Sequence, residues 1–422
     1  MRDRRDPAQE PAEGQTLAGE PGAGEVAVTP AARMAAYVRG GGVVVPVLTA
    51  LLAFLIGGVA VLLAGKDPVA TYEAIWKGTG LQWVFPWVTG EDRELAALNL
   101  QQTLIITTPL ILTGLAVAFA FRAGLFNIGG QGQYIVGSIA AVWVGSEFSG
   151  MPGFLHIVLA ILAACLAGAF WAGIAGGLKA TVGANEVVST IMLNYTAIFI
   201  GLYLFGLGGP LQNDREATLP VSNDVVEAAR LPVFWGDPIL QGLHIGIFVA
   251  LVAAVVFWFL LNRSTTGYEV RAVGLNPEAA RYGGMSVGKN YVLVMAICGL
   301  FAGLAGSLDV LGWQFRIATN DIEINQLGFY GIAVALLGRN TASGTVAGAL
   351  LFGALLSGTS QRNLDPTIFE PELASNLTFI IQGLVVLFVS ADVLVLGFLR
   401  RARGLVSRRS RPSGAATEEA PP

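Results

Sequence analysis

The sequence predicts an all-α polytopic membrane protein with about ten transmembrane helices. Hydrophobic residues make up 54% of the chain and charged residues only 13%, whereas soluble domains carry about 25% charged residues. The apolar residues gather in runs of roughly 20, the length of a helix that crosses a bilayer. Most Lys and Arg residues lie between these runs and concentrate in alternate connections, as they do in proteins that cross a membrane several times.

The predicted transmembrane permease domain covers residues 43–399. Its clear candidate spans are 43–64, 98–121, 154–178, 187–208, 243–262, 291–312 and 377–399. Three further stretches are less apolar or shorter, namely 125–145, 327–338 and 344–359. The last two are interpreted either as two short spans or as a re-entrant pair.

Both ends of the chain are predicted to be tails outside the membrane. Residues 1–42 contain few bulky apolar side chains and therefore bury too little surface to fold, so we expect them to be disordered. Residues 400–422 form a basic tail rich in arginine. A cleaved signal peptide is not expected, because the first apolar run is long enough to span a bilayer. Cys165 and Cys298 lie inside apolar runs and are expected to be core residues, with no metal site and no cofactor.

The distribution of basic residues predicts the orientation of the chain. Placing the N-terminus in the cytoplasm puts most of the 25 Lys and Arg residues on the cytoplasmic side, in accordance with the positive-inside rule. Both termini are then cytoplasmic, and residues 263–290 form the largest cytoplasmic connection. Ten crossings also allow two halves of five helices, which would be inverted relative to each other, as in many transporters.

Three predicted spans carry polar residues on one helical face. The three faces are Asn99, Gln102, Thr103 and Thr107; Asn127, Gln131, Tyr134 and Ser138; and Glu186, Ser189, Thr190 and Asn194. Polar side chains in a membrane usually face the bundle interior or a watery cavity. Such groups either hold neighbouring helices together or form a pathway that binds a neutral, hydroxylated solute.

Carboxylates bear on the choice between a solute pathway and a proton-coupled one. Asp309 lies near the end of its predicted span, where an interfacial or structural role is expected. Asp392 lies deeper in the last span and is the residue that comes closest to a proton-carrying position at mid-depth. The sequence thus favours binding of a neutral solute over proton coupling.

The stretch GLNPEAARYGGMSVGKN at 274–290 differs from the rest of the chain because it is polar. It approaches the phosphate-binding pattern G-x-x-x-x-G-K-[ST], but Asn290 replaces the hydroxyl residue and no strand precedes it. We therefore do not expect this chain to bind a nucleotide. Asn276 is predicted to cap a short helix that starts at Pro277. The pair Gly283-Gly284 is predicted to end that helix, which gives a short helix exposed on the cytoplasmic surface.

This loop resembles the EAA-type coupling loop of ABC-transporter permeases. Three further stretches are similar to the type II permeases for simple sugars, nucleosides and branched-chain amino acids: FNIGGQGQYIVGS (126–138), ANEVVSTIMLNY (184–195) and GFYGIAVALLGRNTASGTVAGALLFG (328–353). The first two most resemble nucleoside uptake permeases. The resemblance implies contact with a separate ATPase through Pro277, Glu278, Ala279, Ala280, Arg281, Gly283 and Gly284.

The resemblance implies a permease subunit of an ATP-driven importer in a bacterial plasma membrane, working by alternating access. It implies as partners an ABC ATPase, a second permease chain (identical or related) and an extracytoplasmic substrate-binding lipoprotein. Membrane lipid surrounds such a protein, and no nucleic acid is expected. As solute-facing residues we expect Asn127, Gln131, Gln133, Asn194 and Tyr195.

Two alternative functions remain open at this point. Within the family, the solute is a pentose, a hexose or a branched-chain amino acid. From a different class, the chain is a stand-alone ion-coupled carrier or channel that needs no ATPase. No enzyme activity is expected, because the spans contain no metal-binding spacing and no nucleophile–base pair.

Overall fold

The computed structural model describes residues 44–360, apart from 64, 149 and 238–241, together with five positions between 379 and 387. The predicted tails 1–42 and 400–422 lie outside the described residues. So do Asp392 and nearly all of the predicted span 377–399.

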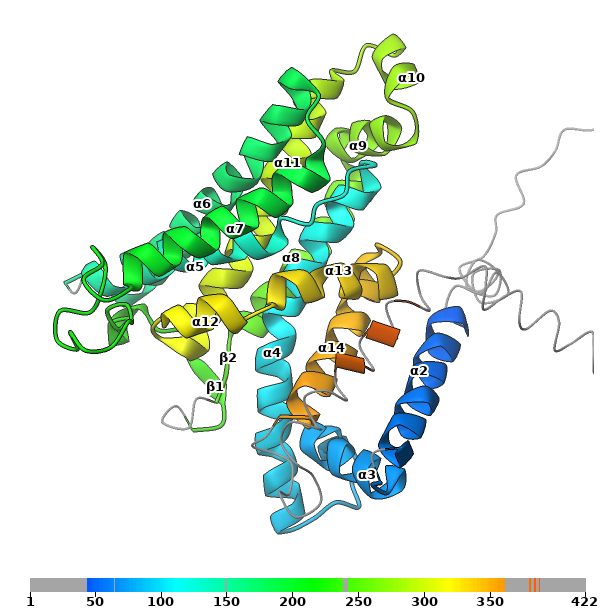
Figure 1. Cartoon of the computed structure of the whole chain (residues 1–422), viewed down its shortest axis with the longest axis vertical. Helices are drawn as coiled ribbons and strands as arrows, with labels where there is room; N and C mark the ends of the chain where they lie inside the picture. The colour runs from blue at the N-terminus through cyan, green and yellow to red at the C-terminus, as the bar shows by residue number, and fades with distance from the viewer. Residues whose placement is uncertain are drawn as a thin grey trace, which may run out of the picture. The chain divides into compact units, whose positions relative to one another are not determined.

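Each predicted span before residue 361 contains a helix (Figure 1). These helices are α2 (Val44–Leu63), α4 (Glu91–Arg122), α5 (Gly130–Glu147), α6 (Gly153–Val182), α7 (Glu186–Phe205), α8 (Gly246–Arg263), α11 (Val287–Asp309), α13 (Leu327–Leu337) and α14 (Ala342–Gly358). Among the described residues, α4, α6, α7, α8 and the stretch Val287–Gln314 are long and apolar enough to cross a membrane. The chain is thus a helical, polytopic membrane protein, while the inverted halves and the side on which each terminus lies stay predictions.

Shorter elements lie in the predicted connections. They are α3 (Pro68–Thr79), α9 (Thr265–Leu275), α10 (Pro277–Tyr282), α12 (Thr319–Ile324), the 3-10 turns Leu81–Val84 and Glu227–Ala229, and a π-helical turn Val310–Gln314 that extends α11. Strands β1 (Val233–Trp235) and β2 (Leu243–His244) pair antiparallel. Because β2 occupies the start of the predicted span 243–262, α8 begins only at Gly246.

Two helix boundaries differ from the prediction for local reasons. Helix α4 begins at Glu91 rather than at residue 98, and its first turn holds Glu91, Asp92 and Glu94, which the positive end of the helix dipole stabilises. Helix α5 begins at Gly130 rather than at 125, so residues 123–129 are not helical. This irregular segment contributes to the candidate site described below.

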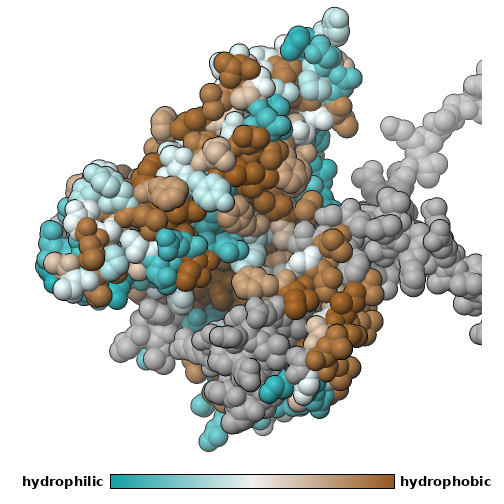
Figure 2. Space-filling view, in the orientation of Figure 1, coloured by the Kyte–Doolittle hydropathy of each residue, from teal (hydrophilic) through white to brown (hydrophobic). Residues whose placement is uncertain are grey.

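Helix α4 lies at the centre of the described fold. It packs against α5, α8, α11, α13 and α14, and Leu112, Leu115 and Phe119 are fully buried along it. Cys298 is buried in the same core, and Cys165 is half-buried. By contrast, α6 and α7 expose large apolar side chains such as Leu166, Phe170 and Phe199. In Figure 2 such side chains cover the sides of these helices, and hydrophilic residues gather near α10, as expected for helices in lipid.

Helices α6 and α11 approach each other closely through small residues. Gly299 and Gly303 are four positions apart on α11, and both face Gly168 of α6. A Cβ atom added to Gly168 would lie 2.3 Å from the carbonyl oxygen of Gly299. In membranes, where lipid is as apolar as the side chains, such close backbone packing is a main source of helix association.

We predict that Gly168→Val destabilises the protein, because the added side chain meets backbone that cannot move aside. Overpacking of this kind costs about 1–3 kcal/mol, which should lower the apparent melting temperature in detergent. Gly173→Val on the same helix is the matched control, because a Cβ there has no neighbour within 4 Å. Equal melting temperatures for the two variants would show that the close approach is not needed.

Candidate functional site

The starts of α5 and α13 meet beside the C-terminal third of α4. Gly130, the first residue of α5, lies against Gly328 of α13 and Val117 of α4. The hydroxyl of Thr113 on α4 donates to the carbonyl oxygen of Leu327 at 3.1 Å. Thr113 is nine residues before the end of α4 at Arg122, or about 14 Å along the helix axis. Val117, which Gly130 contacts, is five residues before that end, or about 8 Å along the axis, so the two helix starts lie at slightly different heights along α4.

Helix starts leave backbone N–H groups without partners inside the helix, and in an apolar environment those groups need other acceptors. Side-chain amides supply them here. Asn194 of α7 accepts from the N–H of Gly132 at 2.8 Å and donates to the carbonyl of Ile128 at 2.9 Å. Gln131 of α5 accepts from the N–H of Gly328 at 2.9 Å. These bonds join α7 to α5 and α5 to α13.

Two more of the predicted residues form a pair between the irregular segment before α5 and the first turn of α5. The side-chain amides of Asn127 and Gln133 bond to each other reciprocally, at 3.2 and 3.0 Å. Asn127 also accepts from the N–H of Gly129 at 2.9 Å. The structure therefore brings Asn127, Gln131, Gln133 and Asn194 together, all buried. We call these four residues the amide cluster.

Tyr195, the fifth predicted solute-facing residue, lies apart from the amide cluster. Its side chain is 57% exposed on the outer side of α7. The reason is helical geometry, because neighbouring residues on a helix point about 100° apart. Its role as a solute-facing residue stays a prediction.

A chain of hydrogen bonds extends from the amide cluster to a buried carboxylate. Gln131 donates to the carbonyl of Asn325 at 2.5 Å, and the Asn325 amide donates to the hydroxyl of Tyr134 at 3.1 Å. Tyr134 in turn donates to Asp309, which also accepts from Gln314 at 2.7 Å. Asp309 is buried where α11 passes into its π-helical turn, so it bonds the α5 side chain within the core instead of facing an interface.

The sequence predicted part of the hydrogen-bond chain between the amide cluster and Asp309. Tyr134 belongs to the predicted polar face of 125–145, whereas Asn325 and Gln314 lie in segments without a helical polar pattern. The first predicted face, on α4, has a different structural role, because Asn99 donates to the carbonyl of Lys77 and Thr103 donates to that of Thr79. That face fastens α3 to α4.

The polar stretch 274–290 forms the short capped helix that the sequence predicts. Asn276 accepts from the N–H groups of Glu278 and Ala279 at 3.0 and 3.1 Å, and Pro277 is the first residue of α10. At its other end, the N–H of Met285 donates to the carbonyl oxygen of Ala280. The N–H of Gly284 donates to the carbonyl oxygen of Arg281. This is the Schellman pattern, which requires a left-handed residue, and Gly284 supplies it with φ of 83°.

Helix α10 has one buried residue and an exposed outer surface. Ala280 packs with Val273 of α9 and Val287 of α11 in a small apolar cluster. Tyr282 is 93% exposed, and the Glu278–Arg281 ion pair (3.4 Å) is exposed as well. The arrangement fixes α10 to its neighbours by a single side chain while its other residues remain available for contact with a partner.

The near match to a phosphate-binding loop serves the packing of two helices. Gly288, Lys289 and Asn290 belong to the first turn of α11. Asn290 is buried and donates to Glu269 of α9 at 3.0 Å. Asn290 occupies the position at which a phosphate-binding loop has Ser or Thr. Its side chain instead bonds α11 to α9.

Comparisons with known proteins show which family the chain resembles. The sequence matches a family model described as "Branched-chain amino acid transport system / permease component" over residues 99–390. The guanosine ABC transporter permease protein NupP of Bacillus subtilis is 39% identical over 85% of this chain and 96% of its own length. A glucose ABC transporter permease protein of Haloferax volcanii is 36% identical over 82% and 86%, respectively. NupQ, a second guanosine ABC transporter permease protein of B. subtilis, is 28% identical over 62% and 81%.

We predict that Asn194→Leu lowers the free energy of unfolding by about 2 kcal/mol, because it leaves the N–H of Gly132 buried without an acceptor. The neighbouring substitution Tyr195→Leu serves as the control, since it changes an exposed side chain of the same helix. Thermal unfolding of the two variants in the same detergent measures the difference. Equal stability of the two would mean that Asn194 does not cap the start of α5.

Proposed function

The chain belongs to the ABC-transporter family of permease components whose model is named for branched-chain amino acid transport, and we propose that it carries a nucleoside across the membrane by alternating access. As a permease component it is a transport subunit and not an enzyme. The observation that carries the proposal is the match with a guanosine permease along 96% of that protein's length. The matched relatives also include a glucose permease, so a simple sugar is the second candidate solute.

The amide cluster supports a pathway for a neutral, hydroxylated solute. In the structure its amides bond to one another and to the N–H groups at the starts of α5 and α13. These groups include both donors and acceptors, which are the partners that the hydroxyl groups and base edges of a nucleoside require. Separation of α13 from α5 would break the bonds that Gln131 makes to Gly328 and Asn325, while the bonds of Asn194 and the Asn127–Gln133 pair remain on the side of α5. The solute then replaces the hydrogen bonds that the separation breaks.

Helix α10 is proposed to be the contact with the ATPase. Its exposed outer surface, its caps at both ends and its attachment through Ala280 suit a small rigid element that fits into a groove of another protein. Contact residues are Pro277, Glu278, Ala279, Arg281 and Gly283, with Ala280 and Gly284 holding the shape. In this proposal α10 faces the cytoplasm of a bacterium, and movement of the ATPase subunits shifts α10 together with α9 and α11.

Further partners follow from the organisation of such systems. ABC transport systems couple permease chains to an ATPase, and two different guanosine permeases of B. subtilis resemble this chain. We propose that the membrane unit pairs this chain with a related second permease. A substrate-binding lipoprotein on the outer side then delivers the solute and sets the direction as import.

We predict that the double variant Glu278→Lys, Gly283→Lys abolishes solute-stimulated ATP hydrolysis by the reconstituted complex. Both positions are exposed, and Gly283 has an ordinary φ of −74°, so lysines fit there without strain, whereas the left-handed Gly284 would be strained. Glu216→Lys is the control, because it reverses one charge of another exposed ion pair, with Arg316. Unchanged stimulation in the double variant would exclude α10 as the ATPase contact.

Uptake of radiolabelled solutes by the complete reconstituted transporter tests the function itself. We expect ATP-dependent uptake of guanosine in preference to pentoses, hexoses and branched-chain amino acids. Preferred uptake of glucose would establish the second candidate. Uptake by this chain without any ATPase would exclude the whole proposal in favour of a stand-alone carrier.

A further inference from the structure

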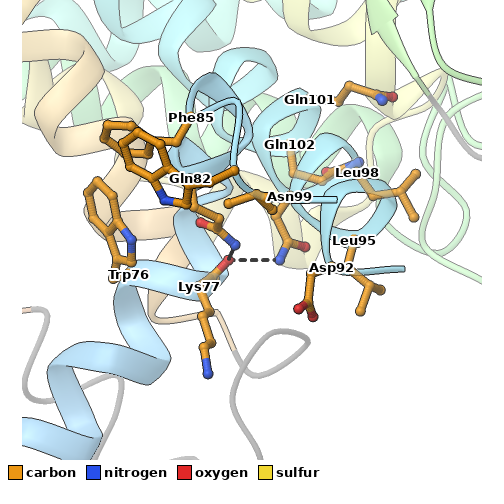
Figure 3. Close-up of a pocket in the computed structure, with 13 residues that line it drawn as sticks. Trp76, Lys77, Gln82, Phe85, Asp92, Leu95, Leu98, Asn99, Gln101 and Gln102 are labelled. Atoms are coloured by element: carbon orange, nitrogen blue, oxygen red, sulfur yellow. Dashed lines mark hydrogen bonds between the residues drawn. The ribbon is translucent and has the colours of Figure 1, made fainter. Parts of the chain in front are cut away.

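A second region of the molecule, separate from the amide cluster, has the dimensions of a ligand site. A pocket of about 800 Å³ lies between α3, the 3-10 turn Leu81–Val84 and the first turns of α4 (Figure 3). Small-molecule sites are usually clefts of about 300–1,000 Å³. The α4 residue Gln101 lines this pocket, and it lies twelve residues, or about 18 Å, before Thr113 at the amide cluster. The two regions are therefore successive positions along one helix.

One wall of the pocket is aromatic. Phe85 and Trp87 stack with ring centroids 4.7 Å apart at an interplanar angle of 23°, and Trp76 lies 6.4 Å from Phe85. All three rings line the pocket, and 44% of Trp76 and 73% of Trp87 are exposed. Exposed, flat aromatic faces of this kind stack with planar rings, including nucleobases.

The opposite wall carries amides from α4, with Gln82 of the turn beside the rings (Figure 3). Asn99 and Gln82 each donate to the carbonyl oxygen of Lys77 at 3.1 Å, which fixes their orientation. The Oε1 atom of Gln82 is buried and has no hydrogen-bond partner among the described residues. A buried acceptor without a partner is unfavourable, so a ligand that donates to Gln82 gains a bond at a site already shaped for it.

The charges of the pocket favour an uncharged ligand. Its lining contains one cation, Lys77, and one anion, Asp92. The Lys77 ammonium is already paired with Glu73 of the same helix at 2.8 Å. Recognition of a phosphate would require a concentration of positive charge, which the described lining lacks.

We propose that this pocket binds the planar base of an uncharged nucleoside before the solute reaches the amide cluster. The proposal rests on the proposed function and specifies it, because it assigns recognition of the base to residues 76–102. The base stacks on the wall formed by Trp76, Phe85 and Trp87, and a donor on its edge bonds to Gln82. The whole solute then moves along α4 to the amide cluster.

Equilibrium binding of radiolabelled guanosine to the full-length chain in lipid nanodiscs tests the proposal, without ATPase or lipoprotein. We expect Trp76→Ala to weaken binding about tenfold, through loss of a stacked ring. Trp143→Ala is the matched control, because Trp143 is 49% exposed on α5, outside the pocket. Gln82→Leu keeps the volume and removes the acceptor, and should weaken binding about fivefold. Free guanine is expected to compete, and free ribose is not.

Several results would overturn the proposal. One is guanosine binding that is unchanged in both Trp76→Ala and Trp87→Ala. The role of the rings would then be to anchor the protein at the membrane surface. Others are competition by ribose but not by guanine, or no guanosine binding at all. Failure of the proposed function can be distinguished from failure of the pocket proposal, because the unmodified transporter then takes up no guanosine. Failure of the pocket alone appears as normal uptake with an unchanged KM in Trp76→Ala.

Discussion

The need to satisfy backbone N–H groups at interrupted helices governs the organisation of this protein. A helix that starts inside an apolar bundle exposes N–H groups that water does not reach. Both α5 and α13 start in this way, and side chains from neighbouring helices bond to their first residues. Asn194 serves α5 and Gln131 serves α13. Because each bond crosses between elements, the positions of α5, α7 and α13 depend on one another.

The N–H and C=O groups at the ends of α10 also need partners, but there the partners are local. As a result, α10 is less dependent on its neighbours than α5 and α13 are. There the caps come from the helix's own flanking residues, Asn276 at one end and the turn at Gly284 at the other. A helix that satisfies its own ends needs few tertiary bonds. It can therefore project from the surface and still keep one shape, which suits an element that transmits movement between proteins.

Much of this organisation follows from local sequence. Apolar runs predicted the helices of the spans, α2, α4 to α8, α11, α13 and α14, and the residues of 276–284 predicted α10 together with both caps. The start of α5 was misplaced, although Asn127 and the glycines at 129 and 130 are residues that favour a helix boundary. Helix α3 was missed inside a predicted connection, although Asp67-Pro68 is the same cap-and-proline signal as Asn276-Pro277.

The partners of the amide cluster depend on the tertiary fold and could not be read from the chain. Periodicity showed that Asn127, Gln131 and Asn194 each belong to a polar face. That Asn194 bonds to Gly132, 62 residues away, depends on how α7 packs against α5. The pocket beside α3 was likewise invisible, since its rings and amides come from three separate elements.

The reciprocal bonding of the amide cluster also bears on leakage through an idle transporter. Every cluster amide already has a partner within the bundle, so water or an ion that enters there must first break existing hydrogen bonds. An apolar molecule of nucleoside size would replace none of them and would leave several N–H groups buried and unpaired. In this conformation the hydrogen-bonded amide cluster therefore opposes the entry of small ions and of apolar solutes alike, even though its side chains are polar.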